Sequence, residues 1–301
     1  METVLITGGT GLIGKALTTA LLQKGYHVII LSRKSRPSAG NVTYAQWDIE
    51  KKQIDISALQ KADHIIHLAG AGVVDKKWTA EYKKEIRDSR TKSSELIIDT
   101  LKNNPHKVKA VISASAVGYY NASPKPHIEN ESADNSFLGE TCRLWEESID
   151  PVQQLNIRLV KLRTGIVLDK NGGALAEFIK PLKLGVAAIL GNGKQIISWI
   201  HIDDLCRLYI YGIENEQINE VYNAVAPEPV SNKTLTLTLA KKRNGKFYIP
   251  MYVPAFVLKI MLGERSVEVL RSLTVSNEKI MQTGFTFLYP DIESALEELV
   301  K

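Results

Sequence analysis

The feature that most constrains the fold is a glycine-rich segment near the N-terminus, TGGTGLIG at residues 7–14. It follows an apolar run at residues 4–6 and precedes an amphipathic helical pattern, which suits a tight turn from a strand into a helix. Gly8 permits the turn, Gly11 lets the backbone approach a pyrophosphate, and Gly14 lets the helix pack closely on the strand. The helix N-terminus then offers free N–H groups to the phosphates. An ordinary glycine turn is the alternative. The predicted dinucleotide contacts are Gly8, Thr10, Gly11, Leu12, Ile13 and Gly14.

Residues 9–15 also spell a second phosphate-binding pattern, Gly-x4-Gly-Lys. That phosphate loop requires Ser or Thr at the next position to hold magnesium, and this chain has Ala16 there. No later apolar strand ends in an Asp suited to bind the metal. The sequence therefore disfavours a nucleoside triphosphatase.

Short apolar runs alternate with helical patterns through the first 165 residues. The expected strands are residues 3–7, 27–31, 42–46, 64–68, 108–113 and 158–162, and the expected helices include 79–102, 140–149 and 203–212. Such runs suit strands buried on both faces, and their alternation with helices predicts a doubly wound parallel α/β sheet of the Rossmann-like class. Asp203 or Asp204 is expected to cap the helix at 203–212, and Ser231 a later one.

Two regions are expected along the chain. Residues 1–165 form the dinucleotide-binding domain, to which some later segments return. Beyond residue 165 the alternation loosens and glycines punctuate loops. Residues 166–301 are therefore expected to form a smaller substrate-binding C-terminal lobe, with a helical tail at about 249–296.

Composition narrows the partners. The 301 residues are 44% hydrophobic, and the net charge of +5 comes from interspersed charges rather than a basic stripe, so no nucleic-acid partner is expected. No run reaches the roughly 18 apolar residues of a membrane span. Two cysteines make neither a disulfide framework nor a metal site, and the first strand leaves no room for a signal peptide. We expect a cytoplasmic protein with a small-molecule substrate, and a homo-oligomer stays open.

The end of the second expected strand indicates which dinucleotide binds. A chain that binds NAD carries Asp or Glu there for the ribose 2′-hydroxyl, whereas this chain has Ser32 and Arg33, followed by Lys34 and Arg36. Cationic side chains at this place suit a 2′-phosphate, so we predict NADP(H), with NAD as the alternative. Asp48 is predicted to accept from the adenine amino group, although a turn role is the alternative. The small-residue strand end Leu68, Ala69 and Gly70 is predicted to lie beside the cofactor's ribose and linker.

Several segments together resemble the extended short-chain dehydrogenase/reductase superfamily, of the NAD-dependent epimerase/dehydratase type. They are TGGTGLIG at 7–14, HLAG at 67–70, ISASAVGYY at 112–120, RTGIVL at 163–168 and WIHIDDL at 199–205. Three further segments, at 76–90, 191–205 and 225–232, resemble its atypical members in particular, and a C-terminal segment near 249–296 extends the likeness over nearly the whole chain. The resemblance implies an NAD(P)-dependent oxidoreductase or epimerase that acts on a small hydroxyl, carbonyl or sugar-type substrate.

The catalytic residues that this resemblance implies are only partly present. Ser115 stands at the family's serine position, where it would bond a substrate carbonyl or hydroxyl. In the family's Tyr-x-x-x-Lys helix this chain has Leu138 and Cys142, and none of its tyrosines has Lys four residues later. Hydride transfer to a carbonyl needs a proton donor, for which Tyr119 and Tyr120 are the candidates. The missing pair leaves open a non-catalytic NADP(H)-binding sensor or interaction module.

The charged segment at residues 85–90 completes the predicted site. Its likeness to the family implies that Arg90 reaches a cofactor phosphate or ribose, with Glu85 nearby. A helix surface held by i,i+4 ion pairs is the alternative. No metal site is expected, because His64 and His67 lie three apart on a strand and point to opposite faces.

Overall fold

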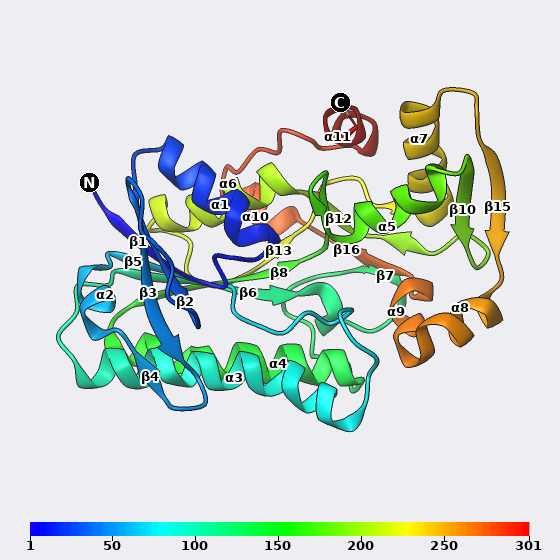
Figure 1. Cartoon of the computed structure of the whole chain (residues 1–301). Coiled ribbons are helices and arrows are strands. Elements are labelled where there is room, and N and C mark those ends of the chain that lie inside the picture. Colours follow the sequence, from blue (N-terminus) through cyan, green and yellow to red (C-terminus); the bar gives the residue numbers. More distant parts are fainter. Residues whose placement is uncertain (301) are drawn as a thin grey trace.

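The computed structural model describes residues 1–300 and is built on one eight-stranded sheet (Figure 1). The strand order is β13-β8-β6-β5-β1-β2-β3-β4, and every neighbouring pair is parallel except β3 and β4. The strands are β1 (Thr3–Thr7), β2 (His27–Ser32), β3 (Val42–Asp48), β4 (Gln53–Ile54), β5 (His64–His67), β6 (Ala110–Ala116), β8 (Arg158–Thr164) and β13 (Val221–Ala224). The predicted Rossmann-like α/β class is confirmed.

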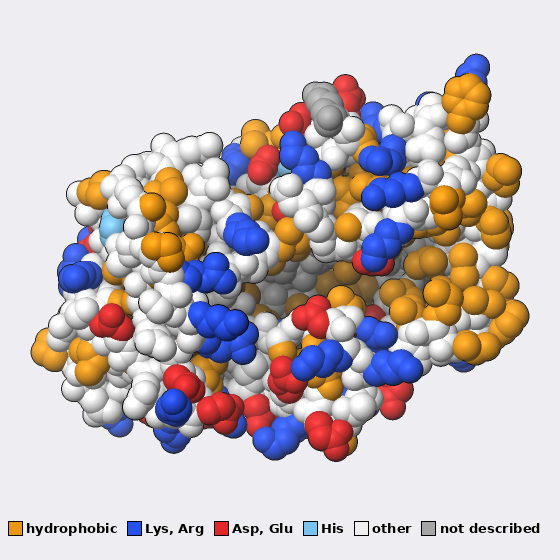
Figure 2. Space-filling view, viewed as in Figure 1, with side chains coloured by type: hydrophobic (Ala, Val, Ile, Leu, Met, Phe, Trp, Pro, Cys, Tyr) orange, Lys and Arg blue, Asp and Glu red, His pale blue; other side chains and the backbone are white. Residues whose placement is uncertain are grey.

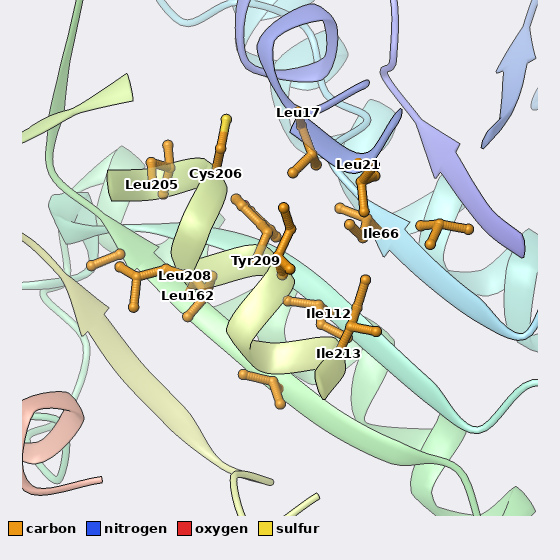
Figure 3. Close-up of a cluster of buried hydrophobic side chains, with 14 of the residues drawn as sticks. Leu17, Leu21, Ile66, Ile112, Leu162, Leu205, Cys206, Leu208, Tyr209 and Ile213 are labelled. Atoms are coloured by element: carbon orange, nitrogen blue, oxygen red, sulfur yellow. The ribbon is translucent and has the colours of Figure 1, made fainter. Parts of the chain in front are cut away.

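Helices cover both faces of this sheet. On one face lie α1 (Leu12–Gln23) and α6 (Ile202–Glu214), and on the other lie α2 (Ile56–Lys61), α3 (Ala80–Asn103), α4 (Phe137–Ile149) and the 3-10 segment η2 (Asp150–Leu155). Because successive strand residues point to opposite faces, Val4 and Ile6 enter the α1–α6 core while Leu5 enters the other. Figure 3 shows Leu17 of α1 pointing toward α6 above the sheet. Truncating such a side chain to Ala typically costs about 2–5 kcal/mol.

A smaller lobe follows the main sheet in sequence and has its own core. Three helices surround that core: α5 (Gly173–Leu182), α7 (Asn232–Asn244) and α11 (Ile292–Leu299). Its strands form two-stranded pairs: β10 (Val186–Leu190) with β15 (Ile249–Val253), β11 (Ile196–Ile197) with β14 (Val230–Ser231), and β9 (Ile166–Asp169) with β12 (Trp199–His201). The remaining elements are η1 (Val117–Tyr119), β7 (Ser123–His127), which pairs with β16 (Leu273–Val275), α8 (Ala255–Leu262), η3 (Gly263–Arg265), α9 (Ser266–Leu270) and α10 (Glu278–Gln282). None of the helices within residues 1–300 is long and apolar enough to cross a membrane.

The chain returns to the main sheet through β13, which forms one of its edges. The Lys279 ammonium on α10 donates to the Val221 carbonyl at 3.0 Å, next to its ion pair with Glu220. At the opposite edge, β4 is only two residues long and antiparallel. Strands β8 and β13, which are more than 50 positions apart in the sequence, thus pair with each other in the main sheet.

The start of α6 corrects a predicted cap. The side chain of His201, rather than Asp203 or Asp204, is the N-cap, with its Nδ1 accepting from the Asp203 N–H at 3.1 Å. Asp204 is fully buried and accepts the backbone N–H groups of Leu288 and Tyr289 at 2.8 and 2.9 Å. The carboxylate therefore ties the C-terminal segment to α6, a long-range role that a local pattern does not reveal.

Candidate functional site

The glycine turn joins β1 to α1 and has the geometry of a phosphate-binding loop. Gly8 has φ +71°, and an added Cβ would lie 2.9 Å from the Leu68 carbonyl. At Gly14 an added Cβ would lie 2.5 Å from the Gly8 carbonyl oxygen. At Gly11, by contrast, it would meet only that same oxygen, at 3.3 Å. Gly11 therefore faces open space and is the place where a ligand can approach the backbone.

The N-terminus of α1 has the free donors that this loop needs. Its N-cap is Gly11, which has no side chain to accept the first N–H groups, and no acidic residue stands in the first turn. Uncapped N–H groups at the positive end of a helix favour an anionic ligand. The residues present therefore fit a dinucleotide pyrophosphate.

Thr7 fastens the glycine turn to the next strand end. Its buried hydroxyl accepts the N–H groups of Leu68 and Ala69, both at 3.1 Å, and donates to Nδ1 of His67 at 2.8 Å. His67 Nε2 then donates toward the hydroxyl of Ser93 or Ser94. Burial lowers the pKa of His67 to about 3, so the imidazole is neutral. This hydrogen-bond chain fixes the spacing between the β1 and β5 ends without contributing a charge.

The residues predicted to bind a 2′-phosphate follow the end of β2. Arg33, Lys34 and Arg36 are exposed, whereas Ser32 is buried and accepts from the Lys34 N–H at 3.3 Å. The Asp48 carboxylate accepts the N–H groups of Glu50 and Lys51, each at 3.1 Å, which is the turn role left open above. The strand end thus presents cations to solvent and no carboxylate from β2.

Ser115 lies near the C-terminal end of β6 and is engaged in a buried network. Its hydroxyl donates to Oε1 of Glu146 on α4 at 2.6 Å. Both Glu146 oxygens also accept from Arg163 on β8, through Nε and Nη2 at 2.8 Å. Burial disfavours the Arg163 charge, but the hydrogen bonds and attraction to Glu146 outweigh it and raise the Arg163 pKa. Since the single Ser115 proton goes to a carboxylate, this hydroxyl is left to accept, rather than donate, toward a ligand.

The same network holds Tyr120. Its fully buried hydroxyl donates to Asn223 Oδ1 at 2.7 Å and accepts from Arg163 Nη1 at 2.9 Å. Burial raises its pKa to about 12. Glu129 closes the network, with its carboxylate accepting the Asn223 N–H at 2.9 Å and its carbonyl accepting from Arg163 at 3.0 Å. Of the two tyrosines predicted as proton donors, Tyr120 thus has its hydroxyl engaged inside the protein.

Tyr119 is placed differently. Its side chain is half-buried, and the Arg163 guanidinium lies over its ring at 3.5 Å from the centroid. Within residues 1–300 its hydroxyl forms no hydrogen bond to another residue. Tyr119 is therefore the member of the pair with a free hydroxyl beside a fixed positive charge.

The helix that carries the family's Tyr-x-x-x-Lys pair is apolar at those two positions. Leu138 and Cys142 are both buried, and burial raises the pKa of the Cys142 thiol to about 12. Arg143 points to solvent and pairs with Glu147 at 2.8 Å, so it is a surface residue of α4. No residue of α4 places a cation where the family has lysine.

Arg90 reaches this region from the neighbouring helix, α3. Its guanidinium lies over the Trp145 ring at 4.9 Å, and Nη1 donates to the Ala71 and Ile86 carbonyls at 3.0 and 2.7 Å. An added Cβ on Gly70 would lie 2.9 Å from Arg90 Cζ. Glu85, by contrast, forms an exposed ion pair with Lys76 at 3.1 Å.

The buried network contains residues that the sequence-based prediction of the site did not include, although the sequence holds a signal for some of them. Asn223 is the polar residue of the short strand VYNA, whereas Arg163 lies in RLVKLRT, which also contains Arg158 and Lys161, so the signal is clear for Asn223 and weaker for Arg163. A polar residue within a strand buried on both faces must find partners there, which marks it as part of a network. Glu129 lies in a loop and carries no such signal.

The surface is hollowed between the part built on the main sheet and the C-terminal lobe, with Lys and Arg side chains along the rim (Figure 2). A parallel sheet with a glycine turn after its first strand, and polar residues at neighbouring strand ends, defines a dinucleotide-binding protein of the Rossmann type. The chain matches the NAD dependent epimerase/dehydratase family over residues 4–224 and a domain of unknown function, DUF1731, over residues 253–299. The protein belongs to the NAD-dependent epimerase/dehydratase family.

Relatives of known sequence or structure resemble the whole chain. The epimerase family protein YfhF of Bacillus subtilis is 35% identical over 99% of this chain and 97% of its own length. The human epimerase family protein SDR39U1 (isoform 2), solved with NADPH, is 28% identical, with a TM-score of 0.88 over 99% of both chains. A nucleoside-diphosphate sugar epimerase from Corynebacterium glutamicum is 30% identical, with a TM-score of 0.78 over 99% of this chain and 58% of that one.

Proposed function

We propose that the protein is an NADP(H)-dependent oxidoreductase or epimerase-like enzyme acting on a small hydroxyl, carbonyl or sugar-type substrate. The observation that carries the proposal is the pairing of an uncapped helix N-terminus at Gly11 with the exposed cations Arg33, Lys34 and Arg36 at the next strand end. The first accepts a pyrophosphate and the second a 2′-phosphate. The NADPH present in the human relative supports the same cofactor.

The chain's own residues would divide the work as follows. NADP(H), when bound, supplies or accepts the hydride. The N–H groups at the start of α1 hold the pyrophosphate, and Arg33 holds the 2′-phosphate. Tyr119 gives a proton to the substrate oxygen when a carbonyl is reduced and takes it back in the reverse direction. Ser115 accepts from a substrate hydroxyl, because its own proton stays on Glu146.

A parallel titration tests the cofactor assignment. The wild type, Arg33→Ala and the control Arg243→Ala, an exposed arginine in the last turn of α7, are titrated with NADPH and NADH by calorimetry. We expect NADPH to bind at least tenfold more tightly than NADH, and Arg33→Ala alone to remove this preference. Equal binding of the two cofactors would refute the Arg33 assignment, and binding of neither would refute the proposed function.

A non-catalytic NADP(H)-binding sensor is the second candidate. The observation that favours it is the commitment of the Ser115 proton to Glu146, together with the apolar residues Leu138 and Cys142 on α4. A panel of carbonyl compounds and sugar nucleotides is incubated with NADPH and the wild type, Ser115→Ala or Tyr119→Phe. Turnover that falls at least tenfold in Tyr119→Phe supports the enzyme, whereas turnover in the wild type no higher than in both variants supports the sensor.

A further inference from the structure

Arg90 is a cation without a counter-ion. Within residues 1–300 no carboxylate pairs with it, and its protein partners are two carbonyl oxygens and the face of Trp145. Only Nη1 makes these hydrogen bonds, so Nε and Nη2 keep their N–H groups for another acceptor. Arg163 and Arg271 differ, because Arg163 is paired with Glu146 and Arg271 lies between Asp134 and Glu268. Arg158 also bonds only backbone carbonyls, but it uses both Nη1 and Nη2 for them. A sheltered guanidinium with unused donors is suited to an oxygen ligand carrying negative charge.

The position of this cation is set by three elements. The guanidinium lies against the Gly70 backbone, just after β5, and over the Trp145 ring on α4. Its charge also acts on the Cys142 thiol, where it opposes the rise in pKa that burial causes. Arg90 therefore lies beside Gly70, which follows β5, and close to Cys142, the α4 residue that we aligned with the family's lysine.

We propose that Arg90 is a second cation of the reaction centre, in addition to Arg163 beside Tyr119, and that it replaces from α3 the lysine that α4 lacks. The inference rests on the proposed function and assigns Arg90 to the nicotinamide end of the cofactor. There Nε and Nη2 donate to an oxygen of the cofactor ribose or of the substrate. The neutral, buried Cys142 carries no charge at the α4 position, and Arg90 supplies the charge from the neighbouring helix.

The proposal places Arg90 at the nicotinamide end of the cofactor and Arg33 at the adenine end, so two probes that differ in these ends can test it. NADPH spans both ends, whereas adenosine 2′,5′-bisphosphate carries only the adenine end with its 2′-phosphate. In Arg90→Gln we expect NADPH to bind at least tenfold more weakly, because a charge-assisted donor pair is lost, while the bisphosphate binds as in the wild type. The matched control is Arg87→Gln, an exposed arginine one turn earlier on α3 whose partner is Asp88. It should leave both affinities unchanged.

A relocation variant distinguishes a lost charge from a damaged loop. In Arg90→Gln/Cys142→Lys the cation returns to α4, and we expect NADPH affinity to recover at least tenfold relative to Arg90→Gln. A purely structural role of Arg90 on the Ala71 carbonyl gives no such recovery. Melting curves accompany each titration. If the double variant does not fold, Arg90→Lys decides: because it keeps the charge but lacks the second N–H donor, it should bind NADPH more tightly than Arg90→Gln and less tightly than the wild type.

The outcomes separate this inference from the function on which it rests. If the wild type binds neither probe, the proposed function fails and the inference fails with it. If the wild type binds both and Arg90→Gln binds NADPH equally well, or loses both probes equally, the inference alone is overturned. Selective loss of NADPH with recovery in the relocated variant supports it.

Discussion

Replacing Arg163 by Met should destabilise the protein by about 3–5 kcal/mol at neutral pH, because it leaves the Glu146 carboxylate buried without its partner. The two side chains are only 3% and 8% exposed, and the guanidinium makes four hydrogen bonds of 2.8–3.0 Å, two of them to Glu146. Urea unfolding followed by circular dichroism measures the loss. With a slope of about 3 kcal/mol per molar urea, the midpoint should fall by about 1 M or more.

Two further variants show whether the buried charge causes the effect. Arg143→Met removes the exposed partner of Glu147 on the same helix and should cost at most about 1 kcal/mol. Arg163→Met/Glu146→Gln removes both buried charges and should be more stable at pH 8 than Arg163→Met alone. The reasoning is refuted if Arg163→Met costs no more than Arg143→Met, or if the double variant is no more stable than Arg163→Met alone.

Three more predictions concern the turn, His67 and Asp204. Gly11→Ala should keep the wild-type melting temperature but weaken NADPH binding at least tenfold. Gly14→Ala should lower the melting temperature by several degrees, because its Cβ would lie 2.5 Å from backbone atoms. Equal melting temperatures of the two variants would contradict the turn geometry. Burial lowers the pKa of His67 from 6.5 to about 3, so the unfolded chain binds one more proton than the folded one between these pH values, and the free energy of unfolding falls by up to about 1.4 kcal/mol per pH unit below pH 6.5. His67→Gln should remove this one-proton contribution and make the urea midpoint less dependent on pH. An unchanged dependence of the urea midpoint on pH contradicts the burial argument. Asp204→Ala should speed amide exchange in residues 284–300 while β1 stays protected, and uniform exchange would show that Asp204 does not anchor this segment.

Local chemistry made parts of this structure predictable from sequence. Ser231 caps its helix as expected, with its hydroxyl accepting the N–H three residues on. Six strands of the main sheet follow the predicted apolar runs, because burial on both faces leaves little alternative, whereas the edge strands β4 and β13 were not predicted. The cap of α6 was predicted wrongly, since Asp204 is taken by backbone groups more than 80 positions away and His201 is left to serve.

The candidate site was less predictable for the same reason. The glycine turn is a local motif, and its geometry follows from three residues. The partners of Ser115 are Glu146, 31 positions away, and through it Arg163. Whether a tyrosine after Ser115 faces a ligand or the interior depends on such long-range hydrogen bonds. A sequence pattern does not distinguish Tyr119 from Tyr120, whereas packing does.

The outer edge of β13 bears on the protein's resistance to aggregation. Edge strands recruit other chains through unpaired backbone groups. Here the Val221 carbonyl is occupied by the Lys279 ammonium, and the Asn223 N–H is occupied by the Glu129 carboxylate. The other edge ends in the two-residue β4, too short to template a partner. Because Glu129 also belongs to the Arg163 network, damage to that network would uncover a strand edge, so that loss of order around Ser115 and self-association would arise from the same lesion.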